Sequence, residues 1–104
     1  MSERELQKAV LELARRLGWR EAHFTTARTN NGGYLTPQQG HPGFPDLVLC
    51  RPPRLVFAEL KVGKNHLSGD QALWLNGLKA CTGTEAYEWR EQDWFTGVIE
   101  SVLS

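Results

Sequence analysis

The stretch Gly43–Lys61, GFPDLVLCRPPRLVFAELK, contains two short apolar runs separated by an Arg-Pro-Pro-Arg segment. The runs Leu47–Cys50 and Leu55–Leu60 are rich in β-branched and aromatic residues and are bounded by proline, which is typical of β-strands. The sequence therefore predicts a β-hairpin, and the rest of the chain is interpreted around it.

The predicted hairpin brings two acidic side chains together. With the turn at the two prolines, counting back along both strands pairs Cys50 with Leu55, Val48 with Phe57, and Asp46 with Glu59. A slip of one residue would send Asp46 to the other face. Directly opposed like charges destabilise a strand pair, so something must offset their repulsion. Mg²⁺, which proteins hold with one or two carboxylates plus water and substrate phosphates, would do so.

Lys61 belongs to the same group, because side chains alternate along a strand and place it on the face of Glu59. Leu60 points into the opposite, apolar layer. The bland interpretation is a surface hairpin in which Glu59 and Lys61 form an exposed ion pair of little energetic weight.

The acidic motif resembles a known nuclease signature. Pro45-Asp46 followed by Glu59-Leu60-Lys61 is similar to the PD-(D/E)XK motif, and GFPDL, FAELK, LSGDQ and an early Gly-Trp pair resemble the virus-type replication-repair nuclease (VRR-NUC) family over nearly the whole chain. The order of the predicted elements indicates an α/β fold with a central mixed sheet, which matches the restriction-endonuclease-like core of that superfamily. We expect one domain, residues 1–104.

The resemblance implies a Mg²⁺- or Mn²⁺-dependent DNA endonuclease that selects branched DNA, such as Holliday junctions or flaps, and acts in DNA repair as a homodimer. Asp46, Glu59 and the carbonyl of Leu60 would bind one or two metal ions, and Lys61 would orient water or offset transition-state charge. A two-fold axis would allow paired cuts. The alternatives are a non-specific or restriction-type nuclease on the same fold, and a catalytically idle DNA-binding module.

The chain is expected to open with an amphipathic helix, capped by Ser2 with Glu5 three residues on and ended by Gly18. Glu3 lies close to the apolar stripe of this helix, whereas Glu5 lies off it. The resemblance implies a catalytic glutamate here, three residues before an apolar position, which Glu3 fits and for which Glu5 is the alternative. Interaction with the helix dipole explains Glu3 equally well.

A second helix is expected to begin at Ser68, with Gln71 completing a capping box, and to end at Gly83. Trp74, Leu75, Leu78 and Cys81 form its apolar stripe. Gln71 has two interpretations: by resemblance it is a catalytic residue that reaches the active site, and by local chemistry it is a helix cap. The cap is favoured.

The remaining elements follow from the same patterns: a strand over Trp19–Thr26, a long loop from Arg28 to Pro42, a strand over Glu85–Trp89, and a closing helix over Asp93–Leu103 with Phe95, Val98, Ile99 and Val102 on one side. Gly97 weakens that helix slightly.

Polar residues that could contact DNA are Arg28, Asn30, Asn31, His41, Lys64 and His66. A solvated loop or turn explains each of them as well.

The net charge is zero, but the charges are unevenly distributed. Residues 15–66 contain eight basic against three acidic side chains, and residues 67–104 contain two against six. This asymmetry suits a polyanion on one side of the protein. We expect a protein of the cytoplasm, because no segment resembles a membrane span or a secretory signal. The family resemblance implies a bacterium or a phage-infected cell. Cys50 and Cys81 are expected to be small buried hydrophobes.

Overall fold

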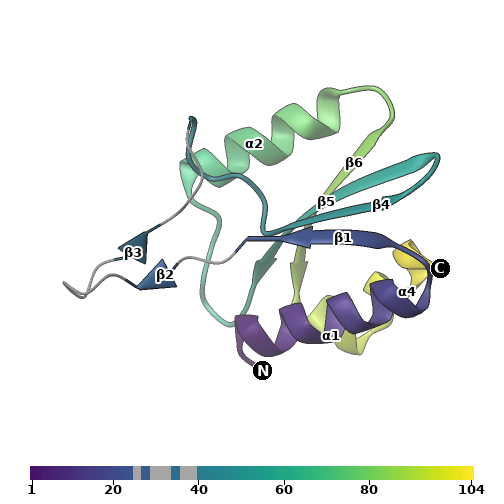
Figure 1. Cartoon of the computed structure of the whole chain (residues 1–104). Coiled ribbons are helices and arrows are strands. Elements are labelled where there is room, and N and C mark those ends of the chain that lie inside the picture. Colours follow the sequence, from purple (N-terminus) through teal and green to yellow (C-terminus); the bar gives the residue numbers. More distant parts are fainter. Residues whose placement is uncertain (25–26, 29–33, 36–39) are drawn as a thin grey trace.

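The computed structural model describes residues 1–24, 27–28, 34–35 and 40–104. They form a small α/β domain with a four-stranded mixed sheet flanked by helices (Figure 1). The strand order is β1-β4-β5-β6. The first three strands pair antiparallel, and β6 runs parallel to β5. The strand bounds are β1 Arg20–His23, β4 Leu47–Arg51, β5 Arg54–Lys61 and β6 Thr84–Arg90. The predicted α/β class with a central mixed sheet is confirmed.

The central hairpin β4–β5 has the predicted register. Val48 pairs with Phe57 and Cys50 with Leu55, and the turn consists of Pro52 and Pro53, joined by a cis peptide bond. The last pair of the ladder is Leu47 with Ala58. One residue further, the same register places Asp46 opposite Glu59.

Helices cover both faces of the sheet (Figure 1). Helix α1 (Glu3–Arg16) contacts β1, β5 and the two short C-terminal helices, α3 (Glu91–Phe95) and α4 (Val98–Leu103). Helix α2 (Gly69–Ala80) lies on the other side, against β5 and β6. The main core lies between the sheet and α1 with α4, and its fully buried members include Leu6, Val10, Leu47, Leu49, Leu60 and Ile99. None of the helices in the described part of the chain has the length and apolar character that crossing a membrane requires.

Both predicted helix starts are confirmed, and their caps have the expected chemistry. The Ser2 hydroxyl accepts from the Glu5 N–H at 3.1 Å, and the Glu5 carboxylate accepts from the Ser2 N–H at 3.1 Å. Ser68 and Gln71 exchange the corresponding pair of hydrogen bonds, at 3.1 and 2.9 Å. These reciprocal bonds satisfy backbone donors that the first helical turn leaves without partners.

The prediction of one continuous closing helix is wrong. Gly97 has a φ of 81° and separates α3 from α4, because this left-handed conformation cannot continue an α-helix. The break changes which side chains face the core: Ile99 is buried, whereas Phe95 is 69% and Val98 is 44% exposed.

Two other predictions need correction. The segment expected to be a continuous loop contains two short paired strands, β2 (Ala27–Arg28) and β3 (Tyr34–Leu35). Cys81 is not a buried hydrophobe, since it follows the last residue of α2 and is exposed, while Cys50 in β4 is half-buried. Both cysteines are free thiols.

Candidate active site

The two acids of the hairpin meet where β4 begins. Glu59 is only 2% exposed, and its Oε1 accepts a hydrogen bond from Gln71 Nε2 at 3.0 Å. Asp46 Oδ2 accepts from the backbone N–H of Leu60 at 2.9 Å. The other oxygen of Glu59, Oε2, is buried and has no hydrogen-bond partner among the described residues. A buried polar atom of this kind is costly unless a further group binds it.

The electrostatics of the pair follow from this burial. Burial away from water raises the pKa of Glu59 to about 8, and the negative charge of Asp46 is the second cause of this increase. Burial also raises the pKa of Asp46 above its ordinary value, against the opposing effect of the Leu60 N–H. The charge of Lys61 lowers the pKa of both acids. Without a bound cation, the pair therefore retains a proton on Glu59 near neutral pH.

These groups fit a hard divalent cation. In a β-strand the N–H and C=O of one residue point to the same side, so the Leu60 carbonyl faces the side on which its N–H meets Asp46. Two carboxylates and one carbonyl leave positions for water and phosphate oxygens, as Mg²⁺ and Mn²⁺ require. No group of three His, Cys, Asp or Glu side chains gathers as a metal cluster in the described ranges. The protein would thus supply a partial ligand set.

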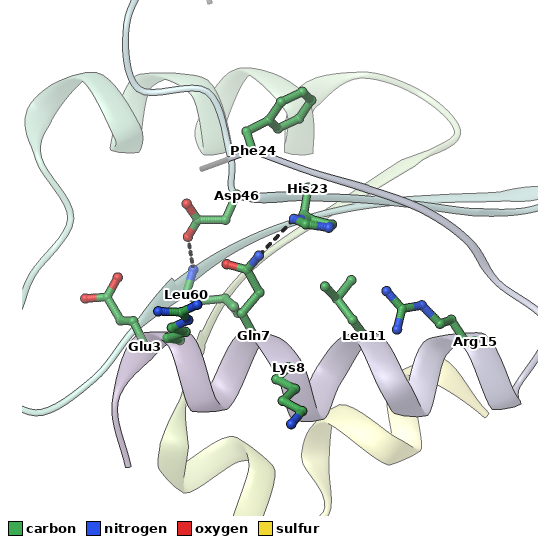
Figure 2. A pocket seen from close by; sticks show the side chains of 10 residues that line it. Glu3, Gln7, Lys8, Leu11, Arg15, His23, Phe24, Asp46 and Leu60 are labelled. Atoms are coloured by element: carbon green, nitrogen blue, oxygen red, sulfur yellow. Dashed lines mark hydrogen bonds between the residues drawn. The ribbon is translucent and has the colours of Figure 1, made fainter. Parts of the chain in front are cut away.

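A cleft of about 750 Å³ opens beside Asp46 (Figure 2). Its walls are one side of α1, the end of β1 at His23 and Phe24, and the pair Asp46 and Leu60. The contribution of α1 consists of Glu3, Arg4, Gln7, Lys8, Leu11 and Arg15. Figure 2 shows Glu3 and Asp46 at one end of this helix and Arg15 toward the other.

Of the two glutamates proposed for the first helix, Glu3 is the one at the cleft. Its Oε2 accepts from Asn65 Nδ2 at 3.1 Å, and its charge raises the pKa of Asp46. Glu5 is exposed and bound to the N-cap, where its hydrogen bonds with Ser2 lower its pKa. Glu5 is therefore a capping residue.

Gln71 makes both of the contacts that its two interpretations require. Its Oε1 caps the N–H of Ser68, and its Nε2 binds Glu59. The start of α2 is held close to the hairpin by Gly43, which has a φ of 92° and whose Cβ, if present, would lie 2.6 Å from the backbone carbon of Asp70. Glycine alone allows this approach.

The next residue reinforces the contact between the Gly-Phe-Pro segment and α2. The ring of Phe44 packs edge-to-face on Trp74 with centroids 5.0 Å apart. Trp74 Nε1 donates to the carbonyl of His41 at 3.2 Å. Asp46 and Gln71 are thus positioned by the same packing.

The described side chains among those that the sequence suggested for DNA contact lie away from the cleft. His41, Lys64 and His66 are exposed, the first against α2 and the others between β5 and α2. Arg28 belongs to β2, and Asn30 and Asn31 lie outside the described residues. The described side chains of this set, His41, Lys64 and His66, do not line the cleft beside Asp46.

The basic residues that do line the cleft are Arg4, Lys8 and Arg15, which sequence reasoning missed. Their spacing along one side of α1 was a usable signal. The sequence did not reveal which side of the helix remains open.

No family model matches the chain, and comparison with curated proteins and with solved structures also gave no match.

Proposed function

We propose that this protein is a metal-dependent DNA endonuclease of the PD-(D/E)XK type, similar to VRR-NUC domains, that hydrolyses phosphodiester bonds and selects branched DNA. The observation that carries the proposal is the buried Glu59 carboxyl, with one oxygen unpartnered among the described residues, facing Asp46 beside an open cleft. Two acids in a low-dielectric site repel each other, and a divalent cation bound by both would offset that repulsion.

The residues have distinct roles in this proposal. Asp46, Glu59 and the Leu60 carbonyl would hold Mg²⁺ or Mn²⁺, which supplies a Lewis acid and lowers the pKa of water. Lys61 offsets negative charge that develops on the phosphoryl group. Gln71 fixes the orientation of Glu59 through its Nε2–H, and Glu3, held by Asn65, orients water at the mouth of the cleft.

The experiment compares a four-way junction, a flap and a plain duplex of matched sequence, each with Mg²⁺, Mn²⁺ or EDTA. Asp46→Asn and Glu59→Gln test the site. Glu100→Gln, an exposed acid on α4, is the matched control. Metal-dependent cutting confined to branched DNA, lost in both site variants and kept in the control, is the expected result.

Other outcomes select the alternatives. Cutting of every substrate would identify a non-specific or restriction-type nuclease. Binding without cutting by the wild-type protein would identify an idle DNA-binding module. Retention of wild-type cleavage in either site variant would refute the site assignment.

A homodimer is part of the proposal for a junction-cutting enzyme, because paired cuts need two sites related by a two-fold axis. Sedimentation of the protein with and without a four-way junction tests it. A single protomer on a cleaved junction would remove that part.

A further inference from the structure

One side of α1 presents basic side chains to the cleft beside Asp46. Arg4, Lys8 and Arg15 are spaced by four and seven residues, so they follow one another along the same side of the helix. All three are exposed. Within the described ranges Arg4 and Lys8 form no ion pair, while Arg15 contacts Glu21 at 3.3 Å through a side chain that is 55% exposed. These three side chains, the basic row of α1, are therefore available to an anionic ligand.

The opposite wall of the cleft is the end of the edge strand β1. His23 Nδ1 and Gln7 Nε2 form a hydrogen bond of 3.1 Å across the cleft, as Figure 2 shows. Phe24 is 45% exposed although it is fixed in place: its N–H donates to the Asp46 carbonyl at 3.1 Å, and its ring packs edge-to-face on Phe44 with centroids 5.6 Å apart. A rigid, half-exposed ring next to a candidate catalytic acid is a surface on which a base can stack.

We propose that this cleft binds a short single-stranded segment of nucleic acid, with its phosphates along Arg4, Lys8 and Arg15 and a base stacked on Phe24. A basic groove combined with an aromatic platform is the arrangement by which proteins bind single strands without reading their sequence. Glu3 and Asp46 at one end repel phosphate, so the phosphates bind along the basic part of α1 and the strand ends next to the acids.

The dimensions favour one strand over a duplex. A volume of about 750 Å³ is that of a site for a small molecule. The row from Arg4 to Arg15 spans about 16 Å of helix, which matches a few nucleotides of an extended strand. The choice of nucleic acid as the ligand rests on the proposed function, and the site deepens that proposal by naming the part of a branched substrate that enters it: an unpaired arm or flap.

The test measures binding in EDTA, so that no cleavage occurs, by fluorescence anisotropy with a labelled thymidine oligomer of about eight nucleotides. The variants are Arg4→Ala with Lys8→Ala, and Phe24→Leu. Lys79→Ala, an exposed basic residue of α2, is the matched control. Thermal unfolding checks that each variant folds.

We expect the Arg4→Ala/Lys8→Ala protein to bind at least about tenfold more weakly and to lose about 1.4 from the slope of log affinity against log salt, since each phosphate contact on a single strand contributes about 0.7. Phe24→Leu should weaken binding about fivefold or more, and Phe24→Trp should retain it. Lys79→Ala should bind like the wild type.

Two results would overturn the inference: the double variant binding like Lys79→Ala, or tighter binding of a duplex of equal length than of the single strand. The proposed function fails separately, if metal-dependent cleavage is absent while the binding losses occur as expected.

Discussion

Replacing Glu59 by glutamine should make the metal-free protein more stable at alkaline pH, although it removes a proposed ligand. The amide of glutamine has the shape of the protonated carboxyl. It accepts from Gln71 as Glu59 does, and it offers an N–H toward Asp46 where the native residue needs a proton. The variant therefore keeps the packing but has no ionisable group at position 59.

The size of the effect follows from the pKa of Glu59. An ordinary glutamate titrates near 4.5, and in the folded protein the pKa of Glu59 is about 8. Between these values the folded state holds a proton that the unfolded state has released, so the free energy of unfolding falls as pH rises. One pH unit corresponds to about 1.4 kcal/mol, which sets an upper limit of about 5 kcal/mol over the window. That is a large fraction of the stability of a small domain.

The assay is urea unfolding in EDTA at intervals between about pH 5 and pH 8.5. The wild type should lose several kcal/mol across the range, and Glu59→Gln should show little of this loss. Glu100→Gln, which alters an exposed acid, should follow the wild type. A wild-type profile that is flat from pH 5 to 8.5, or one that Glu59→Gln reproduces, would show that the two acids are not buried against each other.

Three further predictions concern the binding of Mg²⁺, the close contact between Gly43 and α2, and the ion pair of Glu85 with Arg54. Millimolar Mg²⁺ should raise the melting temperature of the wild type but not of Glu59→Gln, because a ligand that binds only the folded state stabilises it; equal shifts in scanning calorimetry would contradict the site. Gly43→Ala should destabilise the protein by about 2 kcal/mol more than Gly63→Ala in urea unfolding, because both positions have positive φ but only the Cβ at position 43 would meet backbone. Hydrogen bonds from Arg54 lower the pKa of the Glu85 carboxyl to about 2. Glu85→Gln should therefore reduce the free energy of unfolding by about 1–2 kcal/mol at neutral pH, after solvent screening. That difference between the variant and the wild type should vanish as pH falls from about 4.5 to 2. A loss independent of pH in the same unfolding assay would remove the ionic explanation.

The hairpin could be predicted from the sequence because its pattern is local. Two short apolar runs indicate the strands, and with the turn placed at the prolines the register that sets Asp46 opposite Glu59 followed by counting. Helix starts were equally predictable, since a capping box needs only residues three apart. The break at Gly97 was not, because one glycine inside an apolar pattern is compatible with either a weakened or a divided helix, and packing decides between them.

The open side of α1 depends on tertiary packing, which the sequence pattern does not contain. Arg4 and Lys8 look like any exposed positions of an amphipathic helix until β1 is placed as the edge strand. Only then is it visible that the helix leaves a cleft beside His23 and that these two residues border it. Buried residues were predicted from periodicity, whereas the proposed binding surface follows from the order of the strands.

Gln71 shows why a structural and a functional interpretation need not exclude each other. Its Oε1 and Nε2 point to different partners, so the amide caps α2 and orients Glu59 at the same time. The cap fixes the side chain in one rotamer, and a fixed rotamer is what a residue that positions a ligand needs. Gln71→Glu would keep the cap acceptor but replace the N–H donor by a third negative charge near Asp46 and Glu59. Because a third carboxylate attracts a divalent cation, we expect the helix to form normally while the affinity of the site for Mg²⁺ rises, measured by calorimetric titration. Unchanged affinity would mean that Gln71 serves the helix alone.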